Sequence, residues 1–219
     1  MPHKLSVVVT VGSPLAFQSL NGTNLLSAAL KTAHQFCAET GMSNQLFVAA
    51  TNFGQIHEAT SGVAFEFNEI NCDPNDPIQF AAALKELDFE MVAIHDAQRP
   101  LTRAKQFHRT LEGLFGCDAV RPAMAFTETL KAVNSANQLT HTIDRTKVRR
   151  VSSPEIIRRC VIDFASPATE NTSSNWSLPL LPEARISEVE ADPESLRINN
   201  PDEITLMEAF SYWQEKIIN

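Results

Sequence analysis

Short apolar runs alternate with segments of helical periodicity along most of this chain, and this alternation restricts its possible folds more than any other feature. Continuous or β-branched apolar runs predict strands that are buried on both faces. These predicted strands are Leu5–Val11, Gln45–Ala50, Val63–Phe67, Phe89–Ile94, Ala119–Phe126 and Ile186–Val189.

Segments with apolar residues at helical spacing lie between those runs and predict helices. They are Leu25–Phe36, Pro77–Leu87, Thr102–Phe115, Ser153–Ile162 and Pro201–Ile217, with Asn24, Ser153 and Asn200 as expected N-caps. Strands separated by helices form βαβ units, so we expect an α/β fold with a mostly parallel sheet. In such sheets, ligands bind beyond the carboxyl ends of the strands.

Two stretches interrupt the alternation. Leu130–Val151 is too polar for a core and has extended segments on either side of Asn134–Asn137, which predicts a projecting hairpin arm. Ser166–Pro179 is rich in Ser, Thr and Asn, and we expect it to be a mobile loop. With 219 residues, we expect one domain spanning 1–219.

Composition indicates which binding partners are disfavoured and in which cellular compartment we expect the protein. The net charge of −8 disfavours binding to nucleic acid or to an anionic membrane. No apolar run approaches the roughly 20 residues that a membrane-spanning helix needs. The four cysteines lie far apart in the sequence, as free thiols in a reducing compartment do, so we expect a cytoplasmic protein.

Glycine is scarce, which excludes two common nucleotide-binding loops. The chain has seven glycines and no two are adjacent. Neither G-x-G-x-x-G nor G-x-x-x-x-G-K-[ST] occurs, although a phosphate-binding loop of either type needs clustered glycines.

Three segments are candidates for chemistry, and each has a structural alternative. Asp96 follows a buried strand, where it could meet a metal ion or a ribose while Arg99 pairs with phosphate; spacing alone favours a turn cap neutralised by Arg99. Arg197 is expected on a short edge strand before the last helix, where a plain strand–helix junction is the favoured interpretation. His95 is expected to be a packing residue at the strand end.

A basic cluster is the third candidate. It could receive an anionic substrate, or it could form a solvated face, and both remain open. Its members are Arg145, Lys147, Arg149, Arg150, Arg158 and Arg159, six of the 18 Lys and Arg residues.

Taken in order, five motifs resemble those of the 2-C-methyl-D-erythritol 4-phosphate cytidylyltransferase family. The family's H-D-A-A-R-P corresponds to His95–Pro100, and its T-[LM]-K to Thr129–Lys131. T-[VI]-D-R followed by T-P-[QE] corresponds to Thr142–Arg145 and Ser153–Glu155. D-[DE]-A-S corresponds to Asp163–Ser166, and N-I-K-[VI]-T-x-P-E-D to Ser195–Glu203.

The resemblance implies a Rossmann-like, doubly wound nucleotidyltransferase of isoprenoid precursor synthesis, with the arm at about 130–151 forming a homodimer. It implies transfer of CMP from CTP to methylerythritol phosphate with Mg²⁺ present. Carried over by position, Gly12, Asp96, Ala97 and Arg99 meet the nucleotide and Asp96 also meets the metal. Thr129, Arg145 and Ser153 bind the acceptor. Arg197 stands where the family has a catalytic lysine near the α-phosphate, and Asp96 is the second catalytic residue.

The N-terminal third departs from the family pattern. The family's A-A-G-x-G-x-R-M and P-K-Q supply an arginine and a lysine, but no basic residue lies between Lys4 and Lys31 here. The family's G-G-x-x-R-x-x-S-V is replaced by an acidic stretch that contains Asp73 and Asp76. Two hypotheses follow: a divergent cytidylyltransferase that has recruited other cations, and a pseudoenzyme of this fold with a binding or regulatory role.

Overall fold

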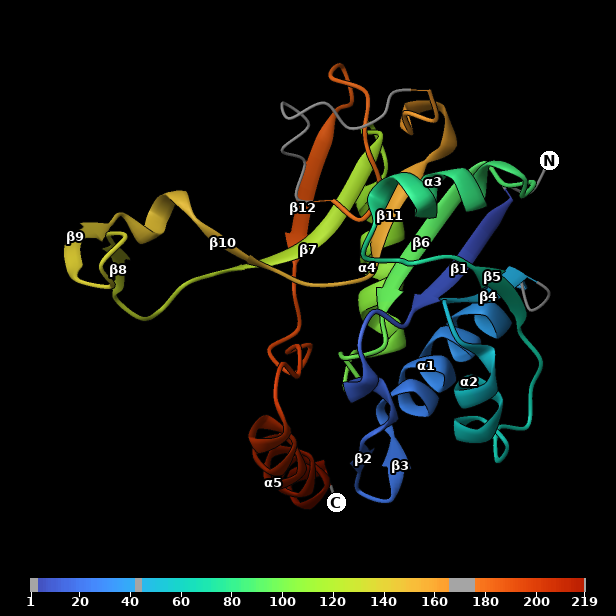
Figure 1. Ribbon diagram of the computed structural model, residues 1–219, viewed down its shortest axis with the longest axis horizontal. Helices are drawn as coiled ribbons and strands as arrows, with labels where there is room; N and C mark the ends of the chain where they lie inside the picture. Colours follow the sequence, from blue (N-terminus) through green and yellow to red (C-terminus); the bar gives the residue numbers. More distant parts are fainter. Residues whose placement is uncertain (1–3, 42–44, 166–175, 219) are drawn as a thin grey trace.

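A computed structural model describes residues 4–41, 45–165 and 176–218, and its centre is an eight-stranded sheet (Figure 1). The strand order is β10–β7–β11–β6–β1–β4–β5, and β12 pairs with β7. The bounds are β1 Leu5–Thr10, β4 Leu46–Ala50, β5 Asn68–Asn71, β6 Met91–Asp96, β7 Ala119–Ala125, β10 Arg149–Val151, β11 Glu155–Arg158 and β12 Ile186–Glu190. The β1, β4, β5 and β6 strands are parallel, whereas β11 is antiparallel to β6 and β7. The mostly parallel sheet is therefore confirmed.

Helices cover both faces of the sheet, as expected for a doubly wound fold. The helices are α1 Leu25–Thr40, α2 Phe53–Ala59, α3 Pro77–Lys85, α4 Ala104–Gly113 and α5 Pro201–Ile218. Consecutive β1 residues divide between two cores: Val7 and Val9 pack with α1 and α4, and Val8 packs with α3. The expected N-cap of α1 is confirmed, since Asn24 Oδ1 accepts from Ser27 N at 2.7 Å. Asn200 Oδ1 likewise accepts from Glu203 N at 3.1 Å.

Two predicted elements were wrong. Val63–Phe67 is not a strand; it is an irregular connection, and β5 begins only at Asn68. Its alternating apolar residues pack from that connection onto α1, where Phe65 stacks on His34 with ring centroids 4.0 Å apart. The helix α2 before this connection was missed in the sequence.

The predicted helix Ser153–Ile162 is instead the strand β11 followed by a 3-10 helix at Arg159–Val161. Ile156 and Ile157 enter different cores on opposite faces of the sheet, because β11 fills the position between β6 and β7. Ser153 therefore caps no helix.

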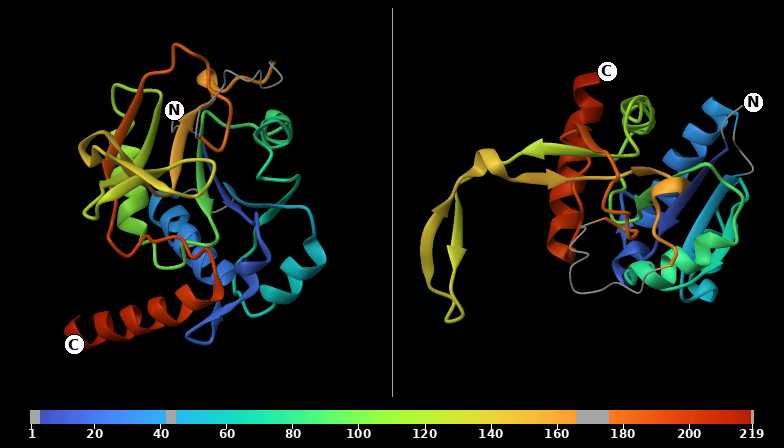
Figure 2. Two further views of the ribbon diagram at one scale, coloured as in Figure 1. Left: turned by 60° about the vertical axis from the view of Figure 1, so that its left-hand side comes forward. Right: turned by 90° about the horizontal axis from the view of Figure 1, so that it is seen from above.

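The predicted hairpin is present and projects away from the sheet (Figures 1 and 2). It consists of β8 Leu130–Val133 and β9 Leu139–Ile143, and its turn contains Asn137 in the left-handed region at φ 56°. The last residues of the predicted range, Arg149–Val151, instead form β10 and pair with β7 in the central sheet. Most of the expected loop at Ser166–Pro179 lies outside the described residues, but Trp176 and Leu178 are buried. Among the described residues, no helix is long and apolar enough to cross a membrane.

Candidate functional site

Asp96 ends β6 at the carboxyl edge of the sheet, beside Thr10 at the end of β1. One of its carboxylate oxygens, Oδ1, accepts from the backbone N–H of Gln98 at 2.9 Å, which is the capping contact that spacing favoured. The other oxygen, Oδ2, accepts from Arg197 Nε at 2.6 Å. Both oxygens of Asp96 are therefore bound within the protein.

Arg197 reaches this carboxylate from the irregular segment before α5, not from the edge strand that we expected. Its Nη2 donates to Gln98 Oε1 at 2.7 Å and its Nη1 to Asn199 Oδ1 at 2.9 Å. The side chain is still 39% exposed. Arg197 and Asp96 thus form a partly exposed ion pair at the carboxyl edge of the sheet.

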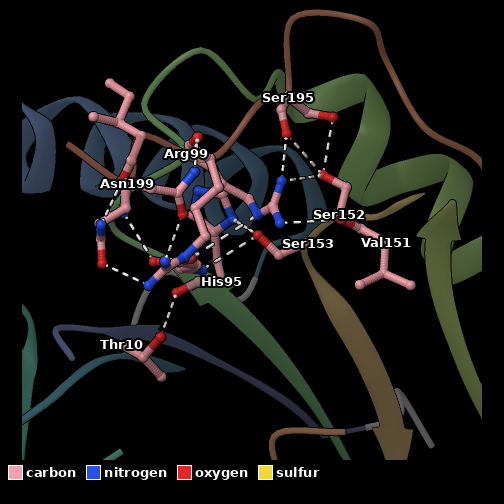
Figure 3. A network of polar contacts seen from close by, with 12 residues as sticks. Thr10, His95, Arg99, Val151, Ser152, Ser153, Ser195 and Asn199 are labelled. Atoms are coloured by element: carbon pink, nitrogen blue, oxygen red, sulfur yellow. Dashed lines mark hydrogen bonds and ion pairs between the residues drawn. The ribbon is translucent and has the colours of Figure 1, made fainter. Parts of the chain in front are cut away.

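Arg99 lies behind that pair and joins three segments (Figure 3). Its guanidinium donates to the carbonyl oxygens of Ser195 at 2.6 Å and Val151 at 3.1 Å. Its Nε is 3.9 Å from Asp96 Oδ2. Burial lowers the pKa of Arg99, although the guanidinium stays protonated at neutral pH. Arg99 is thus placed to hold the turn together, as its carried-over supporting role implies.

Ser153 supports Asp96 from the other side. Its hydroxyl bonds to His95 Nδ1 at 2.8 Å and accepts from Asp96 N at 3.2 Å. His95 is fully buried against Phe107, and burial lowers the pKa of its imidazole to about 4. The packing role expected of His95 is confirmed. The predicted contact of Ser153 with an acceptor stays a prediction. In this structure the Ser153 side chain is buried, and its hydroxyl bonds to His95 and Asp96.

Gly12 borders a cavity of about 270 Å³ at the carboxyl ends of β1 and β4. The lining residues are Val11, Gly12, Ser13, Pro14, Phe17, Ala50, Thr51, Asn52, Gln55, Ile56, Asp73 and Asn75. None of these described residues is basic and one, Asp73, is acidic. Lys31 is exposed on α1 and is not part of this lining.

Asn75 closes over Gly12, a contact that sequence reasoning missed. Its Nδ2 donates to Gly12 O at 2.9 Å, and a Cβ at Gly12 would stand 2.4 Å from Asn75 Oδ1. Asp76 binds the first turn of α3 through Ile78 N and Gln79 N. The cavity therefore presents hydroxyls, amides and one carboxylate to a ligand.

A second cavity of about 440 Å³ lies beside Arg197. Its lining is Arg99, Arg150, Leu196, Arg197, Asn199, Glu203, Leu206 and Met207, and we call it the arginine cavity. Three arginines from distant segments meet here, which no local spacing in the sequence indicates.

The predicted basic cluster does not form one surface. Arg158 donates to the carbonyl of Cys117, and Arg159 to those of Leu87 and Lys85. Arg149 pairs with Glu188 at 3.0 Å. Of the six residues, only Arg150 lines the arginine cavity.

Thr129 and Arg145 are exposed where the arm leaves the sheet, and Arg145 Nη1 donates to the carbonyl of Thr127. The structure groups Arg197 with Asp96 and its neighbour Ala97, whereas Thr129 directly precedes β8 and Arg145 follows β9 at the projecting hairpin. Their predicted role in one acceptor site depends on a second protomer.

Comparisons with known proteins agree with one another. The family model of 2-C-methyl-D-erythritol 4-phosphate cytidylyltransferase matches residues 8–211. The enzyme of that name from Rhodococcus jostii is 26% identical over 205 residues, covering 90% of this chain and 86% of the relative. A bifunctional enzyme IspD/IspF from Oleidesulfovibrio alaskensis is 30% identical over 139 residues, covering 58% of this chain and only 34% of the relative.

Solved structures of similar proteins show the same fold. The 4-diphosphocytidyl-2C-methyl-D-erythritol synthase of Anaerococcus prevotii superposes with a TM-score of 0.76 at 16% identity, covering 97% of this chain and all of that one. The cytidylyltransferase of Thermus thermophilus gives a TM-score of 0.72 at 19% identity, covering 95% of this chain and 99% of that one. The Rossmann-like fold is confirmed.

Proposed function

Because this chain belongs to the 2-C-methyl-D-erythritol 4-phosphate cytidylyltransferase family, we propose that it retains the acceptor half of a cytidylyltransferase site and has lost efficient use of CTP. In the family reaction, a phosphate oxygen of the acceptor attacks the α-phosphorus of CTP, a new P–O bond forms, and pyrophosphate leaves. Such a reaction depends on positioning and on neutralising charge. We therefore use the charged residues of each half to assess the acceptor half and the CTP-binding donor half in turn.

The acceptor half carries two arginines. Arg145 matches the family motif, and Arg197 stands where the resemblance implies a catalytic lysine near the α-phosphate, so we propose that it also binds the acceptor phosphate. Among the residues that the structure describes, Arg197 makes three hydrogen bonds within the protein, which leaves two of its five N–H donors free. Its side chain is partly exposed to solvent, so a phosphate could bind to these donors. The Asp96 carboxylate and the Gln98 side-chain carbonyl accept from Nε and Nη2 of Arg197, and together they hold the orientation of this guanidinium. We propose that Thr129 and Arg145 from the arm of a second protomer complete the acceptor site.

The donor half carries the proposal, because the cavity beside Gly12 has no basic residue in its described lining. A triphosphate chain needs cations or clustered backbone donors, and Asp73 repels it. Losing one preorganised donor costs about 3–4 kcal/mol of transition-state stabilisation, or 10²–10³ in rate. Two independent losses lower turnover by about 10⁴ or more.

We propose that Mg²⁺ binds only together with the nucleotide. Among the described residues no cluster of three metal-ligating side chains occurs, and Asp96 already binds Arg197 and Gln98. These residues do not make a magnesium site on their own, so we assign no step of the reaction to the ion.

Paired calorimetric titrations test this division. We expect methylerythritol phosphate to bind with a measurable heat and Arg197→Ala to weaken that binding by about tenfold or more, because a charge-assisted contact is lost. We expect CTP with Mg²⁺ to bind at least a hundredfold more weakly than it binds a family member that keeps the glycine-rich loop.

The control is Lys147→Ala, an exposed arm residue whose Nζ lies 3.8 Å from Asp144, which should leave both affinities unchanged. Tight CTP binding together with absent acceptor binding would overturn the proposed function.

A further inference from the structure

Arg150 lies on β10 at the base of the arm, and its side chain lines the arginine cavity with Arg99 and Arg197. Strand alternation separates it from Arg149, which pairs with Glu188. The Arg150 guanidinium contacts the thioether of Met124, with Nε 3.1 Å from Sδ. A thioether is a weak acceptor, so this contact satisfies little of the hydrogen-bonding capacity of the guanidinium.

No carboxylate in the part of the chain that the structure describes lies within ion-pair distance of Arg150. Asp96 is taken by Arg197, and both oxygens of Glu203 are bound, Oε2 to Asn199 N at 2.6 Å and Oε1 to Asn200 Nδ2 at 2.9 Å. The Thr127 hydroxyl is the main cause that lowers the pKa of Glu128, and the charge of Arg150 lowers it to a lesser degree.

The charges of Arg150 and Arg197 also affect the protonation of Arg99. Both lower the pKa of the Arg99 guanidinium, after the larger effect of its burial. Three guanidinium groups thus surround the cavity with one lining carboxylate, Glu203, among them. Asp96 offsets the charges of Arg197 and Arg99, from which its Oδ2 lies 2.6 and 3.9 Å away, but it does not pair with Arg150, so an anion bound in the cavity would offset that third charge.

The lining of the cavity also has an apolar part, which comes largely from α5. Leu206 is 65% exposed and lies beside Met207 and Leu196 in the lining. A fully hydrated inorganic anion gains nothing from this apolar part. A small molecule with an anionic group and an aliphatic portion can contact both the arginines and the apolar part at once.

We propose that Arg150 is a specificity-determining residue of the acceptor site, where it binds the anionic group of a small aliphatic phosphomonoester together with Arg197. This inference rests on the proposed function in one respect, namely that the arginine cavity receives the acceptor. Arg150 neutralises and orients the phosphate, while Leu206 and Met207 contact its carbon chain.

Calorimetric titrations of methylerythritol phosphate, methylerythritol and inorganic phosphate into the full-length protein test this inference. We expect Arg150→Ala to weaken methylerythritol phosphate binding by about tenfold or more and inorganic phosphate binding by a similar factor. The Arg149→Ala variant removes the same charge from the adjacent residue and should change affinity less than twofold. Urea unfolding of each variant establishes that the fold is intact.

Each outcome decides between the two proposals. If the wild-type protein binds methylerythritol phosphate and Arg150→Ala binds it within twofold, the inference is wrong and the proposed function stands. If Arg149→Ala loses as much affinity as Arg150→Ala, the inference is also wrong, because the loss then reflects the general surface charge. If only inorganic phosphate binds and this depends on Arg150, the anion site stands and the proposed acceptor is wrong. Failure to bind either anion overturns both.

Discussion

Asp96 and Arg197 are 101 residues apart in the chain, and their side chains meet at 2.6 Å. Arg99 binds the carbonyls of Ser195 and Val151 and so fixes the two segments that flank the pair. An arginine has a planar, forked set of donors, so Arg197 can bind Asp96, Gln98 and a phosphate along different edges. A lysine at this position would present three donors on a single ammonium group, without the planar fork that separates the partners of an arginine.

His95 beneath this pair predicts a pH dependence of stability. Burial lowers its pKa to about 4, whereas the unfolded chain protonates histidine near pH 6.5. The unfolded state therefore binds more protons between these values, and stability that is present above pH 6.5 is lost as the pH falls toward 4. The loss attributable to His95 is about 3 kcal/mol.

Urea unfolding of the wild type and of His95→Gln between pH 7 and pH 4 measures this contribution. The variant is less stable at pH 7 but should lose about 3 kcal/mol less on acidification. His141→Gln, which removes an exposed histidine from the arm, should follow the wild-type curve. Parallel curves for His95→Gln and the wild type would contradict the role assigned to His95.

At the scale of elements, the strands and helices with strong periodicity could be predicted from the sequence. The β1, β6 and α1 elements were predicted in this way, because buried parallel strands are continuously apolar and α1 has both a helical stripe and a cap. The strand β11 could not be predicted, since Ser153 and Pro154 are also a good helix start and only the partners on each side make it a strand.

The candidate site could be predicted in part for a related reason. The motif around Asp96 is local and visible in the sequence, whereas the arginine cavity joins residues from three distant segments. Asn75 was missed because its contact with Gly12 spans 63 residues and leaves no local pattern. Family resemblance supplied Arg197 as a partner of this site, which spacing alone did not.

The N-cap of α1 supports a prediction for this element. Asn24 accepts from Ser27 N through Oδ1, and its Nδ2 donates to Ala59 O at 2.7 Å. We expect Asn24→Ala to lower the free energy of unfolding by about 1–2 kcal/mol in urea denaturation. Asn24→Asp keeps the capping oxygen and should recover part of this loss. An Asn24→Ala protein as stable as the wild type would show that the cap contributes nothing.

At the scale of the whole molecule, the arm projects away from the sheet (Figures 1 and 2). It also carries exposed apolar side chains. Val133 is 59% exposed and its register partner Leu139 is 72% exposed. Exposed apolar residues on a projecting hairpin are typical of a surface that another chain covers. This supports the proposed homodimer, in which each arm brings Thr129 and Arg145 to the partner's site.

Introducing charge on the arm tests that assembly. We expect the double variant Val133→Asp and Leu139→Asp to sediment as a monomer in analytical ultracentrifugation, because two carboxylates cannot be buried without partners. Its far-UV circular dichroism should resemble that of the wild type, and its melting temperature should not depend on protein concentration, because a monomer has no association to lose on unfolding. A variant that remains a dimer would place the interface elsewhere, and a monomeric wild type would contradict the dimer itself.

The central claim is that the acceptor half of the site persists while the cavity beside Gly12 no longer supports a triphosphate. The rate of pyrophosphate release from CTP, with methylerythritol phosphate and Mg²⁺ present, tests it most directly. We predict a rate about 10⁴-fold or more below that of a family member with the glycine-rich loop and its two basic residues, measured under the same conditions. A rate within tenfold of that enzyme would contradict the claim.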